Sequence, residues 1–352
     1  MRRGKVFLYL SLILVLLVAG GYLLYSNFLS PTAGLSDAPA EVAIPDRVDI
    51  VVITQKAPRG TVLDETVLGL IPLPRDLVIA GMFTDLAQVA EPIPGPTIDM
   101  VAGYAKKYGC YIICPLTAIH GDKYMNDSVL LDRRGQVVGI YSKIHPVVEG
   151  SEFRSLEKGM TPGTEARVFD TDFGRVGMQI CFDIFWPETW QELKCNGAEI
   201  VFWSSAYDGG KHLSIHAWNN HFYVVSAVKS RRARIVDVMG EVLGVTGWAD
   251  PVIARTVNLD VEVFHCDFNR SQIPFIRAKY GPDVKIRLWH EEDLFTLEAE
   301  REGLTVEEII REFSLEPLYE YLDRNARLQD AWRRGRAIPD LTPPYVGRPQ
   351  WE

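Results

Sequence analysis

An unbroken apolar run near the N-terminus restricts this chain more than any other feature. Residues 6–25 read VFLYLSLILVLLVAGGYLLY, with no charged side chain, one serine and two glycines. A helix of that length, at about 1.5 Å per residue, reaches roughly 30 Å, the thickness of a bilayer's hydrocarbon core. A buried helix of a soluble domain fits poorly, because the run has no polar face to turn toward water. The sequence therefore predicts one N-terminal transmembrane helix.

A cleaved signal peptide is the alternative interpretation of this run. Signal peptides usually carry an apolar stretch of about 7–15 residues and a small-x-small cleavage site. Here the small cluster is Ala19-Gly20-Gly21, and the apolar run continues past it to Tyr25. We expect residues 1–29 to form an uncleaved anchor that binds membrane lipid through residues 6–25. Residues 30–45 lack apolar periodicity and are expected to form a linker.

Charge gives the anchor an orientation and excludes one class of partner. Arg2, Arg3 and Lys5 precede the apolar run. Because positive residues stay on the cytoplasmic side, we expect a single-pass protein with a cytoplasmic N-terminus and a globular body on the exported side, periplasmic or extracellular. The whole chain has 37 basic and 46 acidic side chains, a formal net charge of −9. With no basic stripe to offset that charge, we expect no nucleic-acid partner.

Short apolar runs alternate with helical patterns between residues 46 and 265. Residues 97–108 show the helical period and stop at Gly109, and residues 187–196 begin with proline and stop at Gly197, as helices prefer. The strand-like runs are 48–54, 76–83, 109–114, 128–131, 137–141, 175–180, 199–203, 222–228, 234–238 and 252–257. Hydrophobic residues make up 47% of the chain, enough for a large core. These patterns predict a mixed α/β layered domain.

The chain changes character after about residue 266. Residues 291–302 and 305–333 are highly charged, and we expect both segments to be helical. Apolar positions such as Ile309 and Leu322 predict that these helices pack on the body or on a partner. The end of the chain is rich in proline, so residues 266–352 are expected to form a helical and proline-rich extension.

The most informative stretch surrounds Cys181. An apolar strand over residues 175–180 leads to this cysteine, and a helix is expected from Pro187. A thiol at such a bend lies near the positive end of a helix, which favours the nucleophilic thiolate, and it is accessible at the edge of the sheet. The alternative is a buried structural cysteine, which is our interpretation of the other four cysteines. Five cysteines in 352 residues do not make a disulfide scaffold.

Lys143 ends the second strand of an expected hairpin, in the stretch Tyr141-Ser142-Lys143. A lysine at this place can be a solvated strand end. Beside an activated cysteine, however, its ammonium group would stabilise the negative charge that develops on a carbonyl oxygen during attack. The residues by themselves leave both interpretations open.

Several stretches form a combination that is more specific than any one of them. They are residues 91–96, 105–109, 141–145, 152, 169–174, 180–184, 187–188 and 197–206. Together they resemble the nitrilase superfamily of carbon–nitrogen hydrolases over roughly residues 46–265. The resemblance implies an αββα sandwich that dimerises through the helix after the cysteine. It also implies hydrolysis of amides, carbamoyl compounds or nitriles through a thioester, without a metal ion or organic cofactor.

The resemblance implies roles for five residues. Cys181 corresponds to the nucleophile and Lys143 to the group that stabilises the oxyanion. Phe182, Trp203 and Ser205 are expected to contact the substrate, a small amide.

The carboxylate that serves as general base in this superfamily has no evident counterpart. Its position falls on Gly81 or Met82, depending on a one-residue gap in the match. Neither residue has a group that can accept a proton and so act as a general base. Asp85 is the nearest carboxylate, a few residues beyond and with a shorter side chain, and is one candidate for a replacement base. Glu152 resembles an additional glutamate that often lies between the lysine and the cysteine. It could position the substrate or the lysine, or act as a replacement base.

Two functions follow, and the sequence leaves both open. The first is a membrane-anchored hydrolase of non-peptide C–N bonds, favoured by the intact Lys143, Cys181 and Glu152. The second is a catalytically impaired scaffold, a homodimer or a subunit of a membrane-associated assembly, favoured by the missing base. An acyltransferase of the lipoprotein-modifying branch fits less well, because that branch has a bundle of transmembrane helices and this chain has one apolar run.

Overall fold

The computed structural model divides the chain into two compact units, residues 1–82 and 83–352, which are described separately. The structure describes residues 47–53, 68–74, 86–149, 154–157, 159–230 and 232–347. In the first unit, β1 (Arg47–Ile53) and β2 (Leu68–Pro74) pair antiparallel. The sequence predicts β1 but not β2.

Some predictions concern residues outside these ranges. They are the transmembrane run 6–25, the linker 30–45, the strand 76–83, Gly81, Met82, Asp85 and Glu152. Among the helices of the described ranges, none has the length and apolar character needed to cross a bilayer.

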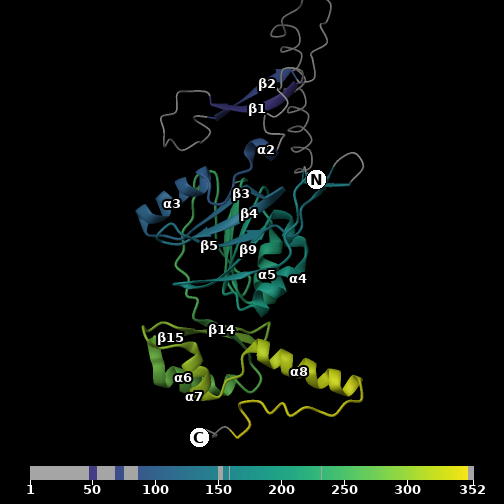
Figure 1. The fold of residues 1–352 in the computed structure, drawn as a ribbon. Helices are drawn as coiled ribbons and strands as arrows, with labels where there is room; N and C mark the ends of the chain where they lie inside the picture. Colours follow the sequence, from purple (N-terminus) through teal and green to yellow (C-terminus); the bar gives the residue numbers. More distant parts are fainter. Residues whose placement is uncertain are drawn as a thin grey trace, which may run out of the picture. The chain divides into compact units, whose positions relative to one another are not determined.

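Two sheets make up the centre of the second unit (Figure 1). The first is antiparallel, in the order β3-β4-β5: β3 (Ile112–His120), β4 (Lys123–Leu131) and β5 (Val137–Ser142). The second has six strands in the order β13-β12-β11-β10-β9-β8: β8 (Val168–Thr171), β9 (Gly174–Ile180), β10 (Ile200–Ser205), β11 (Tyr223–Val228), β12 (Arg234–Val236) and β13 (Val242–Val245). Strands β9, β10 and β11 are parallel neighbours, so their carboxyl ends lie at one edge.

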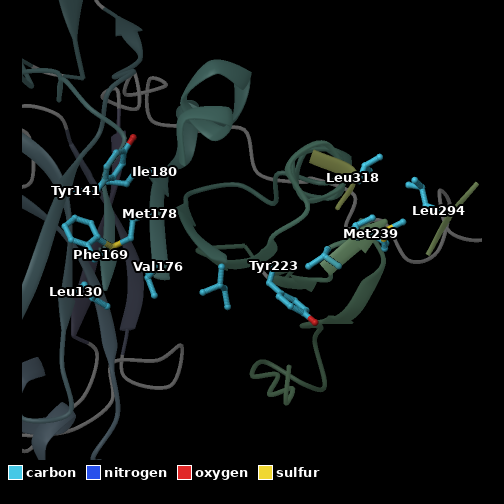
Figure 2. Packing of buried hydrophobic residues seen from close by; sticks show 13 residues of the cluster. Leu130, Tyr141, Phe169, Val176, Met178, Ile180, Tyr223, Met239, Leu294 and Leu318 are labelled. Carbon is cyan, nitrogen blue, oxygen red and sulfur yellow. The ribbon is translucent and has the colours of Figure 1, made fainter. Parts of the chain in front are cut away.

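The two sheets share one apolar core. Leu130 of β4 and Tyr141 of β5 pack in the same buried cluster as Phe169, Met178 and Ile180 from β8 and β9 (Figure 2). Side chains alternate between the faces of a strand, so the neighbours of these residues point outward to other layers.

Helices cover both outer faces. On the first sheet, Ile98 and Ala105 of α3 (Pro96–Tyr108) pack with Val129 and Leu131, which flank Leu130 in β4. On the second sheet, the core under α4 (Pro187–Cys195) and α5 (Lys211–Asn220) includes the buried residues Trp190, Leu193, Val201, Leu213 and Ala217. The order of layers is therefore helix, sheet, sheet, helix, and the expected αββα sandwich is confirmed. The expected helices 97–108 and 187–196 are α3 and α4.

The C-terminal part of the second unit has its own sheet, in the order β14-β16-β15. Its elements are β14 (Val261–His265), η4 (Arg270–Gln272), α6 (Ile273–Tyr280), η5 (Gly281–Asp283), β15 (Val284–Trp289), β16 (Leu294–Ala299), α7 (Val306–Phe313) and α8 (Leu318–Arg333). Phe264, Phe295, Leu297, Ile309 and Phe313 form its separate core. The expected helical segment 305–333 contains α7 and α8.

Two predictions for this end of the chain are wrong. Residues 291–302 are not helical, because they contain β16, the central strand of the sheet, in which all six residues are buried. The acidic Glu298 of this strand pairs with Lys285 of β15 at 2.8 Å, which explains how a charged residue is accommodated there. Residues 252–257 form no strand, and the strand of this region is β14 instead.

Candidate active site

Cys181 lies at the bend that the sequence predicts. Strand β9 ends at Ile180, and Cys181 opens a short 3-10 turn, η3 (Cys181–Phe185), before α4 begins at Pro187. Its backbone has φ of +48°, a left-handed conformation that is unfavourable for residues other than glycine. The Cys181 carbonyl accepts hydrogen bonds from the Trp203 indole at 3.0 Å and the Tyr207 hydroxyl at 3.4 Å. These two donors hold the strained bend in place.

Lys143 is buried, with 2% of its surface exposed. It follows β5, and its main chain is held on both sides: its N–H donates to the Asn126 carbonyl at 2.9 Å, and its carbonyl accepts from the Gly163 N–H at 2.8 Å. The ammonium group contacts the carboxylate of Glu157. A solvated strand end is therefore excluded, because a charged lysine with so little exposure needs a partner.

Glu157 is the residue that the sequence reasoning missed. It follows β7 (Ser155–Leu156), which pairs with β6 (Val148–Glu149) in the loop after Lys143. Besides Lys143, its carboxylate accepts from the Val147 N–H at 3.1 Å and the Asn126 amide at 3.3 Å. The predicted Glu152 is in the same loop but outside the described residues. A loop has no periodicity, so the sequence indicated a carboxylate in this segment without showing which one reaches the lysine.

A cavity of about 530 Å³ brings these groups together. Its lining consists of Pro115, Asn126, Lys143, Glu157, Ile180, Cys181, Ser204, Ser205, Ala206, Ala227, Val228 and Lys229. Among these described residues, Glu157 supplies the one carboxylate. The predicted Cys181, Lys143 and Ser205 thus surround a common space, and Asn126 and Lys229 are polar members that the sequence did not indicate.

Phe182 and Trp203 are not among the residues that line this cavity. Trp203 is fully buried in the core under α4 and α5, because its position in β10 points to the face that the helices cover. Its contribution to the site is the hydrogen bond to the Cys181 carbonyl. The Phe182 ring packs edge-on against Trp186, with ring centres 4.9 Å apart.

Asp183 joins the cysteine bend to the lysine loop. This fully buried carboxylate accepts from the Tyr141 hydroxyl at 2.7 Å and the Ile180 N–H at 3.0 Å through Oδ2. Through Oδ1 it accepts from the His145 N–H at 2.8 Å and lies 3.0 Å from the His145 ring. Ile180 precedes the cysteine, and Tyr141 and His145 flank Lys143. One side chain therefore fixes the two chain segments that carry the candidate catalytic groups.

Burial keeps the two phenols near the site protonated. The pKa of Tyr141 is well above its usual range, because the ring is buried and Asp183 lies beside it. Burial, together with the nearby Cys181 and Asp183, raises the pKa of Tyr207 to about 12. At neutral pH both hydroxyl groups are therefore hydrogen-bond donors, as their contacts with Asp183 and the Cys181 carbonyl require.

One group of possible metal ligands lies elsewhere in the described part of the chain. Ligand atoms of His265, Asp267 and Asp293 lie within 4.8 Å of one another in the C-terminal part. None of the three lines the cavity. The His265 ring nitrogen Nδ1 already accepts a hydrogen bond from the Asp267 N–H at 3.1 Å, so it takes part in a local turn.

Comparisons with known proteins agree with the motifs. The chain is 32% identical to beta-ureidopropionase of Arabidopsis thaliana over 125 residues, covering 35% of this chain and 30% of the relative. It is 30% identical to nitrilase of Pyrococcus abyssi over 164 residues, covering 45% of this chain and 60% of that relative. It is 26% identical to human omega-amidase NIT2 over 215 residues, covering 54% of this chain and 76% of that relative. The alignment thus spans less than two thirds of the length of two of these relatives.

Two kinds of further match were found. The solved structure of Saccharomyces cerevisiae Nit3, a member of branch 10 of the nitrilase superfamily, has a TM-score of 0.40 and 21% identity, covering 45% of this chain and 64% of that one. A model of the family described as carbon-nitrogen hydrolase matches residues 69–262, more than half of the chain. This span includes Lys143, Glu157 and Cys181, and by it the chain belongs to the carbon–nitrogen hydrolase family.

Proposed function

We propose that this protein hydrolyses a non-peptide C–N bond, in an amide or a carbamoyl compound, through a thioester on Cys181. The observation that carries the proposal is the common cavity lined by Cys181, Lys143 and Glu157. A nucleophile, a cation and a carboxylate around one space are the groups that acyl transfer needs. Relatives named omega-amidase and beta-ureidopropionase support testing amides and ureido compounds first.

The first step forms the thioester. The Cys181 sulfur attacks the carbonyl carbon, a C–S bond forms, and negative charge develops on the carbonyl oxygen. The buried Lys143 ammonium stabilises that charge, and Glu157 keeps the ammonium in position through their contact. The C–N bond then breaks, and the proton that the Cys181 thiol gives up passes to the leaving nitrogen.

The second step clears the thioester. Water attacks the acyl carbon, a C–O bond forms, the C–S bond breaks, and the thiol and a carboxylic acid are released. This step needs a base to take the proton from water. Glu157 is the carboxylate that lines the described cavity, so it serves as the proton acceptor in this proposal.

Intact-protein mass spectrometry tests this function. After incubation with activated amides or esters, we expect the wild-type chain to gain one acyl group, and Cys181→Ala to gain none. Brief iodoacetamide labelling should modify Cys181 faster than the buried Cys114 and Cys266. Ammonia release from simple amides gives the turnover. A chain that forms no adduct at Cys181 and shows no turnover contradicts hydrolysis and leaves the scaffold role.

On the basis of the sequence, the globular domain is held at a membrane by the N-terminal segment. The apolar run over residues 6–25 and the basic residues before it form the proposed anchor. Alkaline carbonate extraction should leave the full-length chain in the membrane pellet. A variant in which Leu14 and Leu17 are replaced by arginine should be released, because charges near the middle of a bilayer-spanning helix cost about 2.5–3.5 kcal/mol each. Full-length wild-type chain in the soluble fraction would contradict the anchor.

A further inference from the structure

Helix α8 ends in a turn that its own main chain holds in place (Figure 1). The Arg336 N–H donates to the Ala331 carbonyl at 2.9 Å, and the Gly335 N–H donates to the Trp332 carbonyl at 3.2 Å. Gly335 has φ of +59°, the left-handed conformation that glycine adopts most easily. This arrangement is a Schellman motif, which ends a helix and satisfies its last carbonyls. An ordered turn therefore presents the side chains that follow Ala331.

Every residue from 332 to 338 is exposed, and we call this segment the basic turn. It reads WRRGRAI, with three arginines, two large apolar side chains and no carboxylate. Trp332 is 69% exposed and Ile338 is 55% exposed. The negative end of a helix favours arginines nearby, but it gives no reason for two large apolar side chains to face water. A partner with both charged and apolar parts would use all of these groups.

The basic turn has the opposite charge to the rest of the chain. It carries a formal charge of +3 in a chain of net charge −9, so the other residues together have −12. Arg334 pairs with Asp330 at 2.7 Å, and the Arg333 guanidinium donates to the Gln329 side chain at 3.1 Å. Within the described ranges, neither Arg333 nor Arg336 forms an ion pair with a carboxylate. Positive charge is therefore left for an anionic partner.

We propose that the basic turn docks on a membrane surface that contains anionic lipids. Arginine forms charge-assisted hydrogen bonds to phosphate, and each arginine near an anionic membrane strengthens binding by about fivefold. Tryptophan prefers the boundary between headgroups and acyl chains, because its ring is apolar and its N–H is polar. The proposed anchor at residues 6–25 would keep the chain beside such a surface. No residue of the basic turn lines the cavity, so the inference does not depend on the proposed chemistry.

A nucleic acid is the other large polyanion that arginines bind. The acidic remainder of the chain would repel its phosphates at long range. A nucleic acid also lacks the apolar layer that a bilayer offers to Trp332 and Ile338. The combination of charge and exposed apolar side chains therefore favours the membrane surface.

Quenching of tryptophan fluorescence by brominated lipid tests the docking. The full chain is incubated with vesicles of phosphatidylcholine brominated in its acyl chains, either alone or mixed with phosphatidylglycerol. The difference between wild type and Trp332→Phe isolates the emission of Trp332. We expect the mixed vesicles to quench this emission, and the quenching to be lost at about 1 M salt, where the Debye length is about 3 Å. Trp248→Phe is the matched control, because Trp248 is 85% exposed but has no arginine next to it in the chain.

A charge variant tests the part played by the arginines. Replacing Arg333, Arg334 and Arg336 together by glutamine should weaken docking on the order of 100-fold and so abolish the quenching of Trp332. The matched control removes the same charge from exposed arginines on other elements, with Arg277→Gln, Arg301→Gln and Arg311→Gln. This control should leave the quenching unchanged.

The possible results are distinct. Quenching of Trp332 that needs both phosphatidylglycerol and the three arginines supports the docking surface. No quenching by the mixed vesicles, equal quenching by phosphatidylcholine alone, or quenching that survives in the triple variant overturns it. A response of Trp332 to a single-stranded oligonucleotide, without any response to vesicles, overturns it in favour of a nucleic-acid partner. Carbonate extraction and acyl-adduct formation are separate readouts, so failure of the anchor or of the hydrolase proposal is distinguishable from failure of this one.

Discussion

Replacing Asp183 by asparagine tests whether one buried carboxylate holds the cysteine bend and the lysine loop together. The substitution keeps the shape of the side chain but converts one acceptor oxygen into an NH₂ group. In one orientation this group faces the His145 N–H, which now donates to Oδ1 at 2.8 Å. In the other it faces the Ile180 N–H, which donates to Oδ2 at 3.0 Å. Either way two donors meet, and a buried N–H loses its acceptor.

The expected cost follows from these contacts. A hydrogen bond to a charged group contributes about 1.5–3 kcal/mol, and a buried donor without a partner adds its desolvation penalty. We expect Asp183→Asn to lower the free energy of unfolding by about 3 kcal/mol, or the Tm by roughly 5–10 °C. Tyr141→Phe removes one hydroxyl donor and leaves the carboxylate in place, so it should cost only about 1–2 kcal/mol.

Two measurements on the full chain check this expectation. Urea denaturation followed by circular dichroism gives the loss of stability in Asp183→Asn and Tyr141→Phe. Iodoacetamide labelling reports whether the environment of Cys181 has changed. Cys195 is the internal reference, because it is exposed, contrary to the expectation that it is buried. The reasoning is refuted if Asp183→Asn unfolds within about 0.5 kcal/mol of the wild type and Cys181 labels at the wild-type rate.

Three further predictions concern the same fold. Glu157→Ala leaves the buried ammonium of Lys143 without its partner, so it should lower the free energy of unfolding by about 3–5 kcal/mol, as measured by urea denaturation. Adding Lys143→Met removes the unpaired charge and should restore part of this stability. Burial lowers the pKa of His216 to about 4, so the unfolded chain takes up a proton at a higher pH than the folded chain does. The stability of the fold should therefore decrease as the pH falls from about 6.5 toward 4. In His216→Gln, the Tm measured over this pH range should change less. Gly163→Ala should lower the stability measured by thermal unfolding by about 1–3 kcal/mol, because a Cβ there would overlap the main chain of β5. Gly103→Ala has open space around it in α3 and should raise the stability by about 0.5–1 kcal/mol.

The sandwich itself follows largely from local patterns. The apolar period and the proline and glycine boundaries predict α3 and α4, and the apolar run before Cys181 predicts β9. The misplaced segments have a physical explanation. Strand β16 is buried on both faces and lies between two partners, so its sequence does not show the alternation of a half-buried strand. Its charged surroundings along the chain then suggested a helix.

Local sequence also identified part of the site. Cys181 lies half-buried at a strand-to-helix bend, and Lys143 directly follows β5, so both are visible as short motifs. The substrate contacts expected for Phe182 and Trp203 are ones that the family resemblance implies. A resemblance between short motifs does not fix the direction of a side chain, and Trp203 points to the helix-covered face of β10.

The sequence by itself therefore determined the layered α/β class, the place of Cys181 at a strand-to-helix bend, the place of Lys143 after a strand, and the apolar run that predicts an anchor. Each of these is encoded within a few consecutive residues. Only the tertiary structure decided that Glu157 contacts Lys143, that Asp183 joins residues 38 and 42 positions away, and that Lys229 shares a cavity with Cys181. These contacts depend on how a loop folds back and on which strands are neighbours in a sheet. Both are set by packing of the whole core, so no local pattern of residues contains them.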